Sequence, residues 1–353
     1  MQDKKTKKSP RKILLTILFV AINIAVIAIT AFSEFGNSEN ATKLSEVQFN
    51  FWYLIPAIVI FLVALYIEIH KFAMVTKKTC KLTTRAEIKK ANKDARRAYL
   101  IGRYYDNITP AAIGGQPFQI YYMNKNAGVS GGLATTIPII SMISGQIGFL
   151  IIAVICFSLG SLVVQNATLI AAACFGLLFY AFWPVAVLIA TFLPKTTAEI
   201  ITLGVRFLAK LHIIKNKTAA IEKAKHGVNE YARCVKLILK TRGLFIKTIL
   251  MSVAFHLLIS SIPFFVLNAF GSNIEFIPCF VTVVAVTSAV YFIPTPGNAG
   301  AAEGTFYAVF SSLSSGYIFW AMLAWRFFSY YAYIIFGGLT YLSMHLEKKK
   351  SKR

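Results

Sequence analysis

The apolar residues of this chain gather in long blocks rather than in short alternating runs. Residues 13–32 contain no charged side chain, and about 20 helical residues suffice to cross a bilayer. Similar blocks lie at 51–70, 133–159, 169–193, 244–270, 276–293 and 317–344. The pattern predicts an all-α, polytopic transmembrane helix bundle of about 7–8 membrane segments, and its repetition excludes a lone signal peptide.

The charged residues support this class and predict a topology. Only 14% of the 353 residues are charged, which is too little to cover a soluble domain of this size. The net charge of +23 is concentrated between the apolar blocks, at 1–12, 71–97, 195–242 and 345–353. The positive-inside rule predicts that these segments and both termini are cytoplasmic and that the acidic stretch 33–50 is external. Membrane topology therefore explains the charge without nucleic acid.

The longest polar stretch, 195–242, has about 48 residues, fewer than the roughly 100 of a typical catalytic or nucleotide-binding domain. We therefore expect residues 1–353 to form a single integral membrane domain. An apolar stripe at helical spacing runs along its first half: Ile200, Leu203, Phe207, Leu208 and Leu211. This stripe indicates either an amphipathic helix at the membrane interface or a cytoplasmic helix that packs on the bundle.

The sequence gives no sign of a metal or cofactor site. The five cysteines include no C-x-x-C pair, and the five histidines have no ligand spacing. The phosphate-binding pattern G-x-x-x-x-G-K-[ST] does not occur, which argues against ATP-driven transport by these residues. We expect neither a cofactor nor a metal.

Two stretches rich in proline and glycine interrupt the helical pattern, at 107–117 and 294–303. Proline removes a backbone donor and glycine permits left-handed turns, so together they end one helix and start another. Irregular backbone survives in a membrane only where protein or a water-filled cavity surrounds it. We therefore expect both stretches to face the interior and to flank a substrate site, with free helix N-termini suited to a phosphate.

The two stretches also align without gaps at an offset of 186 residues. The matching positions are Thr109 with Thr295, Pro110 with Pro296, Gly114 with Gly300 and Tyr121 with Tyr307. An internal structural duplication would explain the match, and chance similarity between two Gly/Pro-rich segments would also explain it.

Ionisable residues near the membrane interior, which are costly and usually paired or functional, give a second indication. Glu303 falls at the third helical position if Gly300 is the N-cap, so it can cap the helix, and it can also pair with Arg326. The functional alternative is contact with a cationic headgroup or a role in proton coupling. For His256 we favour a hydrogen-bonded core histidine over a proton relay, and Arg103 and Asp106 can snorkel to the interface.

The two motifs carry a resemblance to a known family. Thr-Pro-x-x-x-Gly-Gly-Gln-Pro at 109–117 and Pro-Thr-Pro-Gly-x-x-Gly-x-x-Glu at 294–303 resemble the lysylphosphatidylglycerol synthase transmembrane family. This is the flippase-like membrane domain of the bacterial multiple peptide resistance factor. The similarity runs from about Arg11 to Leu346.

The resemblance implies a bacterial cell membrane protein that moves aminoacylated phosphatidylglycerol between leaflets and so confers resistance to cationic antimicrobial peptides. In the family a separate cytoplasmic domain makes the lipid from lysyl-tRNA and phosphatidylglycerol. These 353 residues contain no such domain, so we expect no synthase activity from them alone. Phosphatidylglycerol lysyltransferase activity, alone or with a partner subunit, and a non-transporting scaffold for lipid modification are the alternatives.

We expect the lipid to meet the two breaks and the charges beside them. The candidate lipid-binding and translocation residues are Thr109, Pro110, Gly114, Gly115, Gln116, Pro294, Pro296, Gly297, Gly300, Glu303 and Arg326. The expected partners are the membrane and phosphatidylglycerol or its aminoacyl ester. A second copy of the chain and a separate synthase subunit are further candidates, and tRNA is disfavoured.

Overall fold

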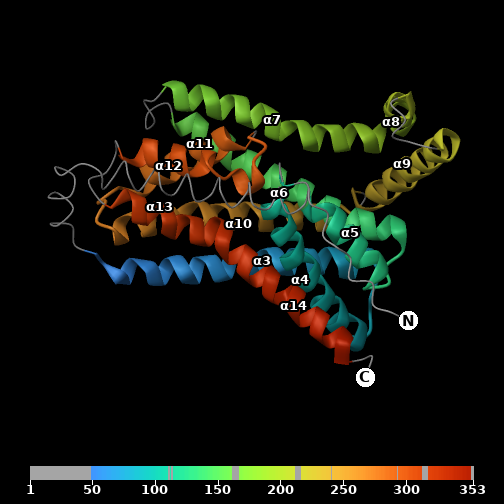
Figure 1. The fold of residues 1–353 in the computed structure, drawn as a ribbon, viewed down its shortest axis with the longest axis horizontal. Coiled ribbons are helices and arrows are strands. Elements are labelled where there is room, and N and C mark those ends of the chain that lie inside the picture. The colour runs from blue at the N-terminus through green and yellow to red at the C-terminus, as the bar shows by residue number, and fades with distance from the viewer. Residues whose placement is uncertain are drawn as a thin grey trace.

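The computed structural model describes residues 49–350 apart from 110–111, 113, 161–166, 211–215, 240, 292 and 312–316. The predicted first span at 13–32 and most of the acidic stretch therefore lie outside the described residues. The described residues form helices, with no strand among them. This confirms the predicted helical membrane bundle (Figure 1).

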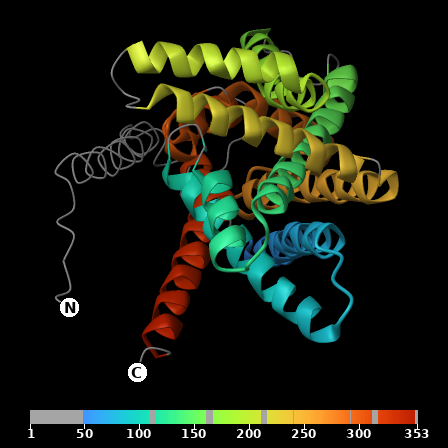
Figure 2. The ribbon, with the colours of Figure 1, turned by 90° about the vertical axis from the view of Figure 1, so that its right-hand side faces the viewer.

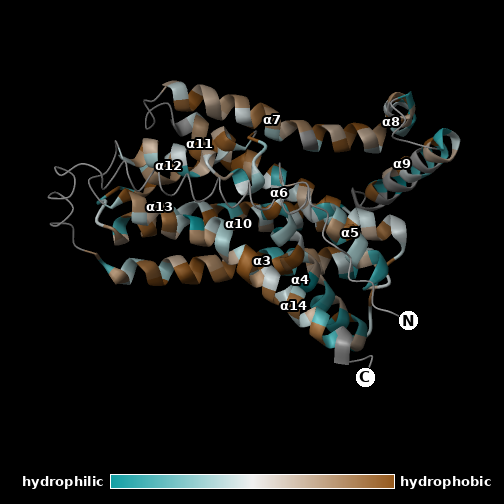
Figure 3. Cartoon of the chain, viewed as in Figure 1, coloured by the Kyte–Doolittle hydropathy of each residue, from teal (hydrophilic) through white to brown (hydrophobic). Residues whose placement is uncertain are grey.

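Five helical segments of the described chain are long and apolar enough to cross a membrane. They are α3 (Leu54–Thr79) with the short η1 (Phe51–Tyr53) before it, α6 (Gly131–Gly160), α7 (Ala167–Phe192), α10 (Arg242–Ala269), and α13 (Ile318–Arg326) continued through η4 (Phe327–Tyr331) into α14 (Ala332–Lys350). Hydrophobic residues dominate these segments, whereas hydrophilic residues are frequent along α4 and α9 (Figure 3).

The bundle has two distinct ends. At the basic end, α3 finishes with Lys77 and Lys78 in its last turn, and α8, α9 and the C-terminal end of α14 lie there too (Figure 1). At the opposite end, the Asn50 N–H donates to the Ala269 carbonyl at 2.8 Å, and the Tyr317 N–H donates to the Phe270 carbonyl at 3.0 Å. The first of these bonds joins the start of α3 to the end of α10, and the second joins that end to the start of α13.

A helical hairpin follows α3 and occupies the first broken stretch. Its arms are α4 (Arg85–Ile108) and α5 (Gly115–Lys125). The Thr84 side chain caps the start of α4, and its hydrogen bonds to Glu87 hold the pKa of that carboxyl below its usual value. The Tyr122 hydroxyl donates to Asp94 at 2.9 Å, which shows that the arms run antiparallel. Because α3 ends and α6 begins at the basic end, this hairpin dips into the bundle and returns to that end.

A second hairpin lies at the second broken stretch. Its arms are α11 (Phe276–Val290) and α12 (Ala301–Ser311), with the turn η3 (Pro296–Asn298) between them. The Phe306 and Trp325 rings stack at 4.5 Å, and Glu303 meets Arg326, so α12 runs antiparallel to α13, back toward the opposite end.

The structure therefore differs from the expectation that 276–293 crosses the membrane. The 15 residues of α11 reach only about 22 Å at 1.5 Å per residue. Gly297 and Gly300 then turn the chain with φ values of 59° and 88°, which only glycine adopts readily. With neither hairpin counted as a crossing, the described basic segments still fall at one end of the bundle.

The two hairpins belong to an inverted repeat. The order α3, α4, α5, α6 matches the order α10, α11, α12, α13–α14, and α5 and α12 each have 11 residues. Equivalent neighbours touch in both halves: α3 packs on α4 and on α6, as α10 packs on α11 and on α13. Since α3 runs toward the basic end and α10 runs away from it, the halves have opposite orientations. These correspondences favour duplication over chance.

The long polar stretch forms two helices, α8 (Pro194–Lys210) and α9 (Lys217–Leu239), which lie side by side across the basic end (Figure 2). Ile200, Leu203 and Phe207 are 60%, 62% and 63% exposed, so this part of the apolar stripe is not covered by the bundle. The side chain of Leu208 and residue Leu211 lie outside the described part. The uncovered stripe favours the interfacial helix over the packed one.

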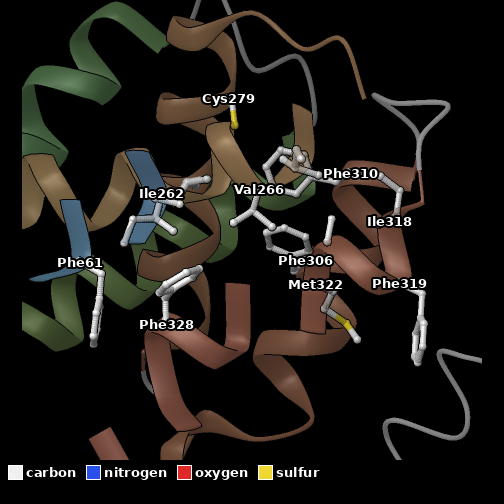
Figure 4. Close-up of a cluster of buried hydrophobic side chains, with 14 of the residues drawn as sticks. Phe61, Ile262, Val266, Cys279, Phe306, Phe310, Ile318, Phe319, Met322 and Phe328 are labelled. Atoms are coloured by element: carbon white, nitrogen blue, oxygen red, sulfur yellow. The ribbon is translucent and has the colours of Figure 1, made fainter. Parts of the chain in front are cut away.

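The largest buried apolar cluster surrounds the second hairpin. Phe306 and Phe310 of α12 pack against Val266 of α10 and against Ile318 and Met322 of α13 (Figure 4). The two phenylalanine rings are 1% and 0% exposed. The opposite end of the bundle is therefore closely packed around this hairpin.

A close approach between α7 and α11 provides a test of this packing. A Cβ on Gly176 would overlap the Ser288 carbonyl oxygen, whereas a Cβ on Gly204 of α8 would meet nothing. We expect Gly176→Ala to lower the free energy of unfolding by about 1–3 kcal/mol. Gly204→Ala, the control, should leave it unchanged or raise it by up to about 1 kcal/mol. Thermal unfolding in detergent measures both, and equal stability of the two variants would contradict the packing described.

Candidate functional site

The first hairpin turns through a network of side chains bonded to backbone. The Gly115 N–H donates to the Asp106 carboxylate at 2.9 Å, and the Gly114 N–H donates to the Thr109 hydroxyl oxygen at 2.9 Å. The Thr109 hydroxyl in turn donates to the Tyr105 carbonyl at 2.7 Å. Asp106 and Thr109 thereby satisfy the free N–H groups at the start of α5, which would be costly to leave unpaired in an apolar bundle.

Arg103 lies beside this turn and links it to the last span. Its guanidinium nitrogen NH1 is 3.9 Å from the Asp106 carboxylate, and its centre lies 4.7 Å above the Tyr333 ring. Its Nε is buried without a hydrogen-bond partner among the described residues. Arg103 is thus held near a carboxylate and retains a free donor.

The second hairpin turns through a more tightly bonded network. One Glu303 oxygen accepts from the Gly300 N–H at 2.8 Å, and the other accepts from Arg326 Nε at 2.7 Å. The Arg326 guanidinium also donates to the Gly297 carbonyl at 3.2 Å and lies 4.6 Å above the Tyr330 ring. Glu303 and Arg326 are 3% and 4% exposed. Both structural predictions for Glu303, the helix cap and the ion pair, are confirmed.

The two turns lie close together beside the last span, near its π-helical turn η4. α4 contacts η3, and the stacking partners Tyr330 and Tyr333 lie on neighbouring positions of η4 and α14. A Cβ on Gly297 would overlap the Tyr330 ring, so only glycine allows this approach. Each turn therefore has the same three parts: a carboxylate on a glycine N–H, an arginine beside it, and a tyrosine under the arginine.

A cavity of about 670 Å³ lies beside the first turn, between the α4–α5 hairpin, α6, α7 and α10. Its polar lining is drawn from distant parts of the chain: Glu68, Arg103, Asp106, Gln116, Gln119, Ser141, Gln146 and His256. The Ser141 hydroxyl and the Gln146 side-chain oxygen are buried without a hydrogen-bond partner among the described residues. Buried polar groups without partners mark the cavity as a place where a polar ligand or water would be satisfied.

The charges of the cavity are arranged in pairs. Lys71, 1% exposed, donates to Glu68 at 2.6 Å and to the Ser252 hydroxyl oxygen at 2.9 Å. Glu68 lines the cavity and Lys71 lies behind it. Arg103 and Asp106 form the second, looser pair. A pair of this type could bind a headgroup that carries both a phosphate and an amine, because the cation would bind the phosphate and the carboxylate would bind the amine.

An aromatic layer closes the cavity toward the opposite end. The Tyr180 and Tyr291 rings meet edge-on at 4.0 Å, and Phe149 lies 5.1 Å from Tyr180. In the second half of the repeat, the positions equivalent to Gln116 and Ile120 hold Ala302 and Phe306, which are 3% and 1% exposed. The polar cavity therefore occurs beside the first hairpin, whereas the matching region of the second hairpin is filled.

The structure separates the sequence-predicted residues into two groups. Gln116 lines the cavity, and Thr109, Gly114 and Gly115 form the turn beside it. Pro110 lies outside the described residues. The candidates at the second turn are not among the cavity-lining residues: Pro294, Pro296, Gly297, Gly300, Glu303 and Arg326. Whether any of these residues contacts lipid stays a prediction.

The other ionisable residues noted in the sequence lie at the cavity, unlike the candidates at the second turn. Arg103, Asp106 and His256 all line the cavity. His256 Nε2 is 3.1 Å from the Gly145 carbonyl, which agrees with the hydrogen-bonded histidine that the sequence favoured. The sequence reasoning missed Glu68 and Lys71. Their spacing of three residues at the end of an apolar block was the available signal.

The buried pair at the second turn predicts a coupled effect on stability. Glu303→Gln leaves Arg326 as a buried charge without a counterion, and we expect a loss on the order of 3 kcal/mol. Arg326→Gln should cost a similar amount, and the double variant should cost less than the sum because no unpaired charge remains. Thermal unfolding of the four proteins in detergent gives the cycle. Additive losses would show that the pair does not act as a unit.

Comparison with known proteins places the chain in a family. Residues 13–337 match the model of the family described as "Lysylphosphatidylglycerol synthase TM region". A search of curated proteins and a search of solved structures gave no match. The family match includes both broken stretches and every helix from α3 to α13. The chain therefore belongs to the lysylphosphatidylglycerol synthase transmembrane family.

Proposed function

We propose that this protein moves a phospholipid headgroup between leaflets through the cavity beside the first hairpin. The observation that carries the proposal is the polar cavity itself, which gathers Arg103, Asp106, Glu68 and His256 between mainly apolar helices. Ionisable residues at such a depth are costly and mark substrate pathways by default. The family membership supports a lipid linked to lysylphosphatidylglycerol synthesis or translocation.

The charges of the cavity fit phosphatidylglycerol and its aminoacyl ester. Arg103, with an unpaired Nε, would bind the phosphate as a charge-assisted donor. Glu68 and Asp106 would accept from the ammonium groups of a lysyl ester, which plain phosphatidylglycerol lacks. Gln116 would donate to ester or hydroxyl oxygens. The ratio of the translocation rates of the two lipids would therefore measure how much the two carboxylates contribute to headgroup recognition.

The inverted repeat suggests how the lipid would pass. In transporters built from inverted repeats, the two halves exchange conformations and so expose the site to each side in turn. Here the cavity lies beside the first hairpin and the second hairpin is packed. We expect a second state in which the α11–α12 hairpin loosens and the Tyr180–Tyr291 contact opens. In this scheme the ion pair between Glu303 and Arg326 keeps the second turn closed. Transport would require this ion pair to break.

We further propose that the basic end is cytoplasmic in a bacterial cell membrane, as the positive-inside rule indicates. The described residues would then form one membrane domain, with α8 and α9 at the inner surface. Movement of aminoacylated lipid outward would reduce the negative charge of the outer leaflet and so protect against cationic antimicrobial peptides. This movement would depend on a synthase activity that supplies the aminoacylated lipid.

The proposal predicts that Arg103→Gln reduces lipid translocation at least tenfold, because loss of a charge-assisted contact to phosphate costs roughly 1.5–3 kcal/mol. Arg85→Gln, at the exposed start of the same helix, is the matched control and should move lipid at the wild-type rate. The measurement is loss of labelled phosphatidylglycerol, or its lysyl ester, from one leaflet of proteoliposomes. Chromatography in detergent confirms that each variant is folded.

Gln116→Leu provides a second variant, since Gln116 lines the cavity without forming the turn. It should lower translocation severalfold. Wild-type rates in both folded cavity variants would rule out the cavity as the path. No movement of either lipid by the folded wild-type protein would favour the lysyltransferase alternative, alone or with a partner subunit, or the scaffold alternative.

A further inference from the structure

A second concave site lies on the face of α3 that points away from the cavity. It is a groove of about 970 Å³ between α3 and α4. The residues that α3 contributes to the groove include Tyr66, Ala73 and Lys77, whereas those that it contributes to the cavity are Glu68 and Phe72. At 100° per residue these two sets fall on opposite sides of the helix. The groove is therefore separate from the proposed transport path.

The groove has a charged half and an apolar half. α4 contributes Lys89, Lys90, Lys93 and Arg96, all exposed, and Lys77 of α3 joins them near the basic end. Among the described residues no carboxylate lines the groove. Glu347 of α14 approaches one of these cations, Lys93, at 3.6 Å and leaves the other four without a carboxylate partner within 4.0 Å in the described chain.

The apolar half lies along α3, farther from the basic end than Lys77. Tyr66, Ile69 and Ala73 lie on the same groove-lining face of α3 as Lys77, about one to three turns nearer the start of the helix. Tyr66 is 65% exposed, and its ring stacks on His70 at 5.7 Å. Tyr66 precedes Lys77 by 11 residues, or roughly 16 Å along the helix. The groove thus has cations on its α4 side and at Lys77, and apolar side chains along α3 over a distance that suits the chains of an amphiphile.

We propose that this groove binds an anionic phospholipid, with the phosphate among the α4 cations and the acyl chains along the Tyr66 face of α3. A free phosphate or a nucleic acid would use the cations and leave the apolar half unexplained. A zwitterionic lipid has no net charge and would therefore neutralise none of the positive charge, whereas each anionic lipid neutralises one unit. Basic pockets between membrane helices on this side of a bilayer bind anionic headgroups in general. The site does not depend on translocation by the cavity.

The test is a binding titration on the full-length protein in detergent, read by native mass spectrometry. The probes are phosphatidylglycerol, phosphatidylcholine and glycerol 1-phosphate. The groove variant is Lys89→Gln/Lys90→Gln/Arg96→Gln. The control is Lys217→Gln/Lys225→Gln/Arg233→Gln on α9, which removes the same charge from exposed positions at the same end. Thermal unfolding confirms that both variants are folded.

We expect the groove variant to bind phosphatidylglycerol at least about tenfold more weakly than the wild type, and the control less than twofold more weakly, since each cation near an anionic headgroup favours binding about fivefold. Phosphatidylcholine and glycerol 1-phosphate should bind the wild type weakly. Equal losses in the two variants would overturn the proposal, because the effect would then be one of net charge. Tight binding of glycerol 1-phosphate would also overturn it, in favour of a site for free anions. Neither result would alter the translocation test on Arg103.

Discussion

Backbone that leaves the helical pattern inside a membrane protein must find its hydrogen-bond partners within the protein. This chain meets that constraint twice with a carboxylate placed on a glycine N–H, Asp106 on Gly115 and Glu303 on Gly300. Each carboxylate has an arginine beside it, and each arginine lies over a tyrosine of the last span. The two turns can therefore lie deep in the bundle, and the positions of the hairpins, the cavity and the π-helical turn all depend on them.

The two turns differ in how tightly they are held. Both Glu303 oxygens are bonded and the pair with Arg326 is almost fully buried. Arg103 and Asp106 are farther apart, at 3.9 Å, and face a cavity. In an inverted repeat, this difference between equivalent regions is what distinguishes one conformational state from the other. The asymmetry gives the proposed transport cycle a physical basis, because the loose turn in one state would become the tight turn in the next.

The two concave sites have different chemistry. The cavity mixes carboxylates, a guanidinium and amides, which suits a headgroup of mixed charge. The groove between α3 and α4 presents cations above an apolar face, which suits an anionic lipid. They lie on opposite faces of α3. A lipid held in the groove and a headgroup passing through the cavity would therefore contact different residues. Variants can be chosen that affect one site alone.

The sequence by itself determined the helical membrane class, the positions of the two breaks, and the capping role of Glu303, because these depend on hydropathy, on proline and glycine, and on residues close together in the chain. It also contained the constant offset between the two breaks that indicates a duplication, which the equal lengths of α5 and α12 support. Only the tertiary structure showed that both breaks are the turns of helical hairpins, and that the two hairpins enter the bundle from opposite ends. It also brought Glu68, Arg103, Gln146 and His256 to one cavity. Hydropathy along one chain cannot reveal which helix faces meet, since that depends on how helices distant in sequence pack against one another.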